Sequence, residues 1–210
     1  MKSLGVSMMK NYCIRPDYIS RNQATFKDMC SRSSGYQRKV YEIARYIAVK
    51  QNLRTVVDFG CGGAQKLLEF FPEFQIIGVD LEPTVSQLRD RYPQYHWLTP
   101  DQTSEINSAD LVICADVIEH VIDPDEVIEA IGQMNPRFAV FSTPDREYLV
   151  KHCHHKQTGP PQSIYHVREW TFEEFYNYMS FHFKILKHIN VPNVDQECQL
   201  MICTLKNDFV

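Results

Sequence analysis

The sequence has no long apolar run and no compositionally biased tract. No stretch approaches the roughly 20 consecutive apolar residues of a transmembrane helix, and the first residues lack the apolar core of a secretory signal peptide. Glycine accounts for 8 of the 210 residues and proline for 11, without periodicity, so collagen-like and disordered chains are excluded. We therefore expect an intracellular, cytoplasmic globular protein.

Paired cysteines are also lacking. The chain has 7 cysteines, an odd number at irregular spacings, and no Cys-x-x-Cys pair. Such a pattern argues against both a disulfide framework and a zinc knuckle. We expect reduced thiols.

Two segments of the chain each have few charged residues of one sign. Residues 1–50 hold ten Lys and Arg against three Asp and Glu, whereas residues 101–150 hold two against eleven. A basic segment suits an acidic acceptor such as a nucleic acid or a sugar nucleotide, and a solvated helix face is the alternative. The isoelectric point of about 6.1 argues against a nucleic-acid partner.

Short apolar segments alternate with amphipathic ones, which is typical of a parallel sheet covered by helices on both faces. Apolar positions at helical spacing follow Gly35, and further helices are expected at 65–70, after Pro83 and at 124–134. Strands are predicted at 55–59, 75–80, 95–98, 111–114 and 137–142. The expected fold is a doubly wound, seven-stranded α/β sheet.

The C-terminal third departs from this alternation. Residues 143–170 have no clear periodicity and predict a long loop that covers the site. Thr171 and Glu174 have capping-box spacing for a helix to about residue 179. Segments 183–189 and 199–205, separated by Pro192 and Asn193, predict a closing antiparallel pair that includes the last strand.

A glycine-rich turn directly follows the first predicted strand. Asp58, Gly60 and Gly62 lie where a strand leads into a helix, and glycines there allow close approach of the backbone to a ligand. A dinucleotide fingerprint requires a small residue where Gln65 stands, so NAD is disfavoured. A P-loop is excluded because Lys66 is not followed by Ser or Thr.

Carboxylates also follow the next two predicted strands. Asp80 ends the second strand, where a carboxylate can accept both hydroxyls of a ribose. Asp58 suits a cationic ligand group, and Asp101 suits an adenine amino group. A ligand with a ribose, an adenine and a positive charge is S-adenosylmethionine.

These motifs, with Asp116 to Val121 after the fourth strand, resemble those of the class I S-adenosylmethionine-dependent methyltransferases. The resemblance implies a methyltransferase domain over residues 36–210, preceded by an N-terminal segment, residues 1–35, that folds over the cofactor. It implies that the cofactor contacts come from Tyr36, Gln37, Asp58, Gly60, Cys61, Gly62, Asp80, Leu81, Asp101 and Asp116.

More narrowly, three stretches are similar to the small methyltransferases of bacterial and viral glycan-synthesis clusters. They are residues 36–44, Lys66 with Leu67, and Ser142 to Arg146 together with the stretches 159–161 and 166–171. Asp145 replaces an Asn that often follows the Thr-Pro of this pattern. The resemblance implies O-methylation of a sugar hydroxyl on a carbohydrate or sugar-nucleotide acceptor.

A rival resemblance is to the methyltransferases that modify the terminal 2′-hydroxyl of small RNAs. In those enzymes a carboxylate-x-x-Glu-His cluster and a distant His bind a divalent metal, and Asp116, Glu119, His120 and His166 match these positions, with Asp at the first. Such a donor set suits Mn, Fe, Co or Zn. Related sequences without a metal share the motif, so we expect no metal.

Proton removal from the acceptor requires a base with a pKa near neutrality. His120 at the sheet edge is the first candidate and His166 the second, with Glu119 orienting either imidazole. A non-catalytic binding module of the same fold is the alternative to an enzyme.

Overall fold

A computed structural model describes residues 35–157, 159–194 and 196–206. Its helices are α3 (Arg38–Lys50), α4 (Gln65–Phe70), α5 (Thr84–Arg91), α6 (Pro124–Gln133), α7 (Arg146–His152) and α8 (Phe172–His182). Its strands are β1 (Thr55–Phe59), β2 (Gln75–Val79), β3 (His96–Leu98), β4 (Leu111–Ala115), β5 (Phe138–Pro144), β6 (Phe183–Asn193) and β7 (Gln196–Leu205).

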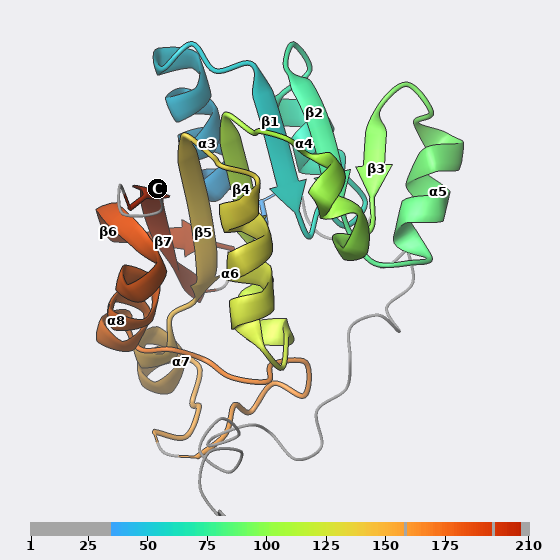
Figure 1. Ribbon diagram of the computed structural model, residues 1–210. Helices are drawn as coiled ribbons and strands as arrows, with labels where there is room; N and C mark the ends of the chain where they lie inside the picture. The colour runs from blue at the N-terminus through green and yellow to red at the C-terminus, as the bar shows by residue number, and fades with distance from the viewer. Residues whose placement is uncertain (1–34, 158, 195, 207–210) are drawn as a thin grey trace, which may run out of the picture.

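In these residues the strands form one seven-stranded sheet in the order β3-β2-β1-β4-β5-β7-β6 (Figure 1). Strands β1 to β5 are mutually parallel, and β7 is antiparallel to both β5 and β6. The doubly wound α/β sheet with an antiparallel last strand is thereby confirmed. The order reverses between β1 and β4, where ligands bind in sheets of this kind.

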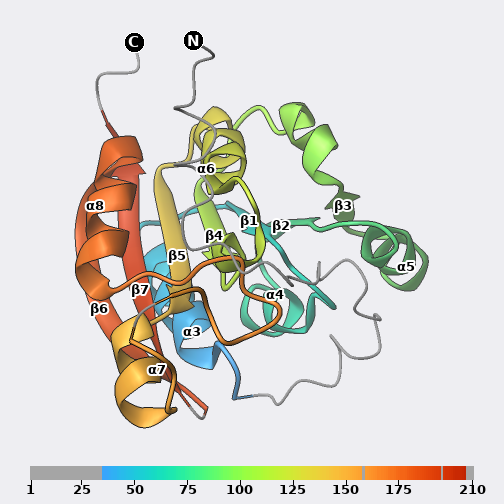
Figure 2. The ribbon, with the colours of Figure 1, turned by 90° about the horizontal axis from the view of Figure 1, so that it is seen from below.

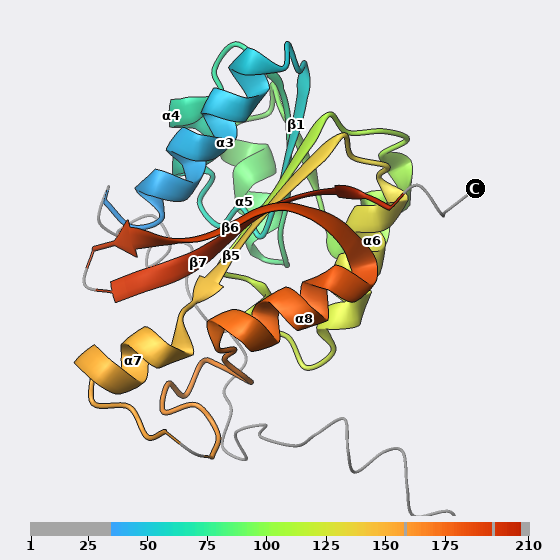
Figure 3. The same ribbon diagram turned by 90° about the vertical axis from the view of Figure 1, so that its left-hand side faces the viewer.

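Alternate residues of the central strands enter two separate cores. Val56 and Leu111 pack with α3, α4 and α5, whereas Val57 and Val112 pack with α6 and α8. Figure 3 shows α3 and α4 on one side of the sheet and α6 and α8 on the other. Because side chains of a strand point alternately to opposite faces, a run of β-branched residues supplies both cores at once.

Two predicted segments differ from the structure. The predicted loop over residues 143–170 contains α7, whose first turn is capped by Asp145, with the Asp145 carboxylate accepting from the Glu147 N–H at 2.9 Å. Strand β6 runs through Pro192 to Asn193, where a separating turn was predicted. Proline is tolerated there because β6 is an edge strand and needs no second ladder of hydrogen bonds.

Two further expectations concern the N-terminal segment and membrane-spanning helices. The predicted N-terminal cofactor segment, residues 1–35, lies outside the described residues apart from Gly35. Among the described helices, none is both long enough and apolar enough to cross a membrane.

Substituting Gly78 on β2 should reduce the stability of the domain. A Cβ at Gly78 would lie 2.5 Å from Cε3 of the buried Trp97 and 2.9 Å from Sγ of Cys61, so Gly78→Ala overpacks the core beneath the glycine turn. We expect a loss of about 1–3 kcal/mol in the free energy of unfolding, measured by urea denaturation.

Gly132 in α6 is the matched control for Gly78. A Cβ there meets nothing within 4 Å, so Gly132→Ala should add roughly 0.5–1 kcal/mol through helix propensity. Equal unfolding midpoints for the two variants would contradict the predicted clash.

Candidate active site at the carboxyl ends of the parallel strands

The turn that follows β1 has a backbone conformation that favours glycine. Gly60 and Gly62 have φ values of 84° and 52°, and the Gly60 N–H donates to the Val79 carbonyl at 2.7 Å. A Cβ at Gly60 would come within 2.3 Å of Cγ2 of Val117, which follows β4. The turn therefore packs tightly against the motif after β4.

Asp80, directly after β2, holds this turn from the opposite side. Its carboxylate accepts from the Gly62 N–H at 2.6 Å and from the Leu81 N–H at 2.8 Å. Burial raises the Asp80 pKa, and the two backbone donors counteract that effect. Each carboxylate oxygen has a second lone pair, so the side chain can still accept hydrogen bonds from a ribose.

Asp58 is buried in β1 and bound by a single side chain. Oδ2 accepts from the Tyr41 hydroxyl of α3 at 2.8 Å, and Oδ1 is buried without a hydrogen-bond partner among the described residues. Burial raises the Asp58 pKa to about 7, although Tyr41 and Lys66 oppose the rise. A buried acceptor of this kind suits a cationic ligand group, and the contact with that group stays a prediction.

The free protein should lose stability as pH rises through the titration of Asp58. Its pKa is about 7 in the folded state against an ordinary value of 3.8, so between about pH 4 and 7 the folded state binds more protons than the unfolded state. Asp58→Asn should remove this fall, which is on the order of 4 kcal/mol at 1.36 kcal/mol per pKa unit.

Urea unfolding at about pH 4, where this range begins, and at about pH 8, above it, measures the difference. The exposed Asp90→Asn variant is the control and should keep the pH dependence of the unmodified protein. If Asp58→Asn and the unmodified protein lost stability equally as the pH rises, the raised pKa of Asp58 would be refuted.

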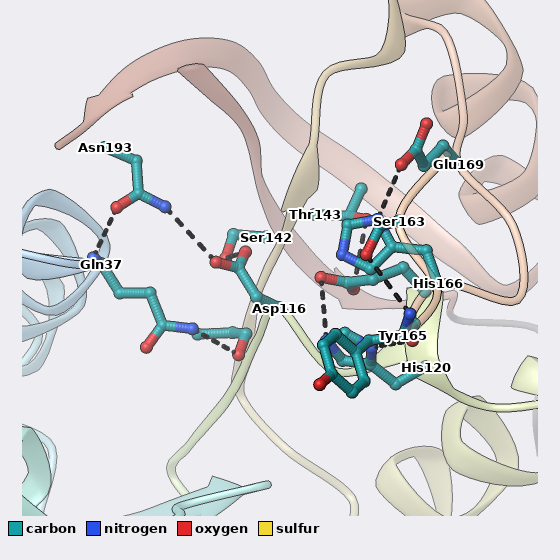
Figure 4. Close-up of polar contacts among 12 residues, drawn as sticks. Gln37, Asp116, His120, Ser142, Thr143, Ser163, Tyr165, His166, Glu169 and Asn193 are labelled. Carbon is teal, nitrogen blue, oxygen red and sulfur yellow. Dashed lines mark hydrogen bonds and ion pairs between the residues drawn. The ribbon is translucent and has the colours of Figure 1, made fainter. Parts of the chain in front are cut away.

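A hydrogen-bonded network joins the start of α3 to the end of β4 (Figure 4). The Gln37 N–H donates to Oδ1 of Asn193 at 2.8 Å, and its side-chain amide donates to the Ala115 carbonyl at 2.8 Å. Asp116 accepts from the Ser142 hydroxyl at 2.7 Å and from Nδ2 of Asn193 at 3.4 Å.

Other predicted cofactor residues lie around the same turn. Cys61 is buried, and its burial raises the pKa of the thiol well above the ordinary value, so it packs as a small apolar residue. Leu81 is 47 % exposed beside Asp80. Asp101 is exposed in a 3₁₀ helix, η2 (Pro100–Glu105), and Tyr36 precedes α3. Their contacts with a cofactor stay predictions.

The candidate catalytic residues form one compact cluster. Glu119, His120 and His166 each present a possible ligand atom, and these atoms lie within 4.8 Å of one another. Glu119 and His120 belong to a 3₁₀ helix after β4, η3 (Ile118–His120), and His166 belongs to the connection between α7 and α8. Seen from the edge where β1 to β5 end, that connection passes over this part of the sheet (Figure 2).

The connection is fastened to Glu119 and His120. The Val167 N–H donates to the Glu119 carbonyl at 2.7 Å, and Nδ1 of His120 lies 2.5 Å from the Tyr165 carbonyl oxygen. A carbonyl only accepts, so Nδ1 of His120 must donate. In the neutral imidazole the lone pair of His120 is therefore on Nε2, which lies 3.7 Å from Oε1 of Glu119.

His166 is oriented in the same way by a buried carboxylate. Its Nδ1 lies 2.7 Å from Oε1 of Glu169, while His155 lies 3.9 Å from the other oxygen of Glu169. Because a carboxylate accepts, Nδ1 of His166 donates and Nε2 keeps its lone pair. The Thr143 hydroxyl donates to Oε2 of Glu119 at 3.2 Å.

The cluster has the features of a divalent metal site. Two imidazoles with fixed Nδ1 donors and one buried carboxylate match the donor set of Mn, Fe, Co or Zn. A cation would also offset the cost of burying the Glu119 carboxylate. Without a cation, Nε2 of His120 has the lone pair that a general base needs.

Sequence reasoning missed the residues that orient the cluster. Tyr165 acts through its main chain, which no motif reveals. Glu169, three residues after His166, carried a usable signal, because buried carboxylates next to histidine ligands commonly fix their orientation. Thr143 and Asn193 are brought in by β5 and β6 and have no local signal.

The strand order, the glycine turn after β1 and the carboxylate after β2 define a class I S-adenosylmethionine-dependent methyltransferase, and its methyl donor is S-adenosylmethionine. The family described as "Methyltransferase domain" matches residues 32–201. The chain belongs to this family.

The curated relatives that the chain matches include small RNA 2′-O-methyltransferases. The chain is 26% identical over 186 residues to a small RNA 2′-O-methyltransferase of Rattus norvegicus, covering 74% of this chain and 46% of the relative. It therefore spans about half the length of that curated relative.

Solved structures show the same fold. The methyltransferase domain of bacterial CtHen1 has a TM-score of 0.58 and 19% identity, over 80% of this chain and 98% of that chain. The N-methyltransferase NodS of Bradyrhizobium japonicum, bound to S-adenosylhomocysteine, has a TM-score of 0.61 and 14% identity, over 89% and 96%.

Proposed function

We propose that this methyltransferase transfers the methyl group to the 2′-hydroxyl at the 3′ end of an RNA. The observation that carries the proposal is the cluster of Glu119, His120 and His166 at the carboxyl end of β4. The similarity to a small RNA 2′-O-methyltransferase over 74% of the chain supports the same acceptor. The predicted sugar acceptor of a glycan or sugar nucleotide stays a prediction.

The terminal ribose of an RNA offers the functional groups that this cluster would hold. Its 2′- and 3′-hydroxyls are vicinal, and two neighbouring oxygens can share one divalent cation. Glu119, His120 and His166 would hold that cation, with Glu169 and the Tyr165 carbonyl keeping both imidazoles in place. A bound cation supplies a Lewis acid that lowers the pKa of a coordinated hydroxyl.

The chain itself would position the acceptor against the cofactor. Methyl transfer from a sulfonium is an in-line displacement, so alignment of the acceptor oxygen with the methyl group is the main protein contribution. Val117 packs on the glycine turn, while Glu119 and His120, only two and three residues later, form the cluster. Cofactor turn and acceptor cluster are thus held in one rigid arrangement.

The segment from α7 to α8, which carries His166, has a few basic residues, which suits recognition of an RNA end. Exposed Lys151 and Lys156 lie at the end of α7 and just after it, and Arg168 follows His166 in the connection between α7 and α8. A few phosphate contacts suffice to position a terminal nucleotide. The isoelectric point of about 6.1 argues against binding of a long nucleic acid through many phosphate contacts.

Labelled S-adenosylmethionine offered with matched RNA ends tests the proposal. One RNA is prepared with a 2′,3′-diol end, a 2′-deoxy end and a 3′-phosphate end, alongside a panel of glycans and sugar nucleotides. We expect label only on the diol end, and that product should resist periodate because its vicinal diol is lost. Label on a sugar acceptor, with all RNA ends unmodified, would replace the RNA acceptor with a carbohydrate.

A further inference from the structure

Asp116 occupies the position of a metal ligand by sequence but faces another partner. Among the described residues, the group of ligand atoms within 4.8 Å consists of Glu119, His120 and His166 and leaves Asp116 out. Asp116 has a left-handed backbone conformation, with φ of 53°, directly after β4. Its carboxylate contacts Ser142 and Asn193, on the α3 side of the site (Figure 4).

The direction of each hydrogen bond fixes the role of Asp116. The Gln37 N–H donates to Oδ1 of Asn193, so the amide NH₂ of Asn193 must face Asp116. The Ser142 hydroxyl is directed at the other oxygen of Asp116. Asp116 therefore accepts from Asn193 and from Ser142, and because the Ser142 hydroxyl can also accept, removing the side chain breaks both bonds whereas a carboxamide could keep them.

We propose that the metal site of this protein has three protein ligands, Glu119, His120 and His166, and that Asp116 is a positioning residue that ties α3 to the end of β4. This inference rests on the proposed function. Two histidines and one carboxylate form a set known to bind a divalent metal and leave positions open for substrate oxygens. The side chain of Asp, one methylene shorter than Glu, is directed at its two donors, and its oxygens lie outside the cluster of possible ligand atoms.

Asp116 acts on the cofactor side of the site through this network. Gln37 also has a left-handed φ of 58°, and it bonds to Asn193 and to the carbonyl of Ala115, the residue before Asp116. A conformation of this kind persists only where surrounding contacts hold it. Loss of the Asp116 carboxylate should therefore disturb the start of α3, from which Tyr41 reaches Asp58.

Calorimetric titrations of the full chain, with Mn²⁺ and separately with S-adenosylhomocysteine, test the assignment. Asp116→Ala should keep its Mn²⁺ affinity within about threefold of the unmodified protein while binding S-adenosylhomocysteine at least about tenfold more weakly. Glu119→Gln and His166→Ala should do the opposite, with Mn²⁺ affinity lowered by about 10–100-fold or more. Tenfold weaker Mn²⁺ binding by Asp116→Ala, with unchanged cofactor binding, would overturn the proposal.

A second variant covers the case in which Asp116→Ala does not fold. Asn193→Ala leaves all four candidate ligands intact and should weaken S-adenosylhomocysteine binding without changing Mn²⁺ affinity. A loss of Mn²⁺ binding in Asn193→Ala would also contradict the three-ligand site.

The RNA assay separates failure of this inference from failure of the proposed function. If RNA ends are methylated but the unmodified protein binds no Mn²⁺, the three-ligand site is wrong and the proposed RNA acceptor is supported. If the titrations show the expected pattern but RNA ends stay unmodified, the metal site stands and the acceptor is wrong.

Discussion

Treatment with a chelator is expected to reduce methyl transfer to an RNA 3′ end by at least about 100-fold, and added Mn²⁺ or Co²⁺ is expected to restore it. Lewis-acid activation contributes several kcal/mol to a transition state, and about 1.4 kcal/mol corresponds to a factor of ten in rate. Glu119→Gln and His166→Ala should lose activity to a similar degree, because each removes one ligand atom of the cluster. Single-turnover rates with labelled cofactor measure the effect.

His96→Ala is the matched control for these variants. His96 is exposed at the start of β3, so its loss should leave rate and metal dependence unchanged. A chelator without effect, combined with a 10²–10⁴-fold loss in His120→Ala that high pH partly restores, would make His120 a simple base as predicted from the sequence. That outcome would remove the metal from the proposed function.

The sheet was predictable because its strands carry a strong local signal. Residues 55–59 and 111–115 are short apolar runs that supply both cores, and such runs are recognisable without tertiary contacts. The glycine turn was predictable for a similar reason, since few residues other than glycine adopt the positive φ of Gly60 and Gly62. Helix α7 was missed because only Leu149 of its seven residues is buried, which is too few for a helical pattern.

The candidate site was predictable as a set of residues but not as an arrangement. Sequence spacing placed Asp116 with Glu119 and His120, because all three follow β4 within one short stretch. The left-handed backbone of Asp116 turns its side chain toward Asn193, which is 77 residues away along the chain. A positive φ at a non-glycine residue and a contact between β4 and β6 both depend on the folded chain, so neither is visible in a local pattern.

Asp80→Ala is expected to abolish most of the cofactor affinity. The carboxylate both holds the Gly62 and Leu81 N–H groups and would accept the ribose hydroxyls, and hydrogen bonds to a charged group contribute about 1.5–3 kcal/mol each. Loss of two such bonds corresponds to roughly a 100-fold or greater rise in the dissociation constant of S-adenosylhomocysteine. Calorimetry measures the constant directly.

Thermal unfolding separates lost binding from lost folding in the Asp80 variant. At a hundredfold excess over the dissociation constant, a one-site ligand adds about 2.7 kcal/mol of stability, and this gain should disappear in Asp80→Ala at the same ligand concentration. Asp90→Ala, an exposed residue on α5, should keep the full gain. Asp80→Asn keeps one acceptor oxygen and should fall between the two. If folded Asp80→Ala retained the gain, Asp80 would serve only to hold the glycine turn, and the ribose would have to be bound elsewhere along the carboxyl edge of the sheet.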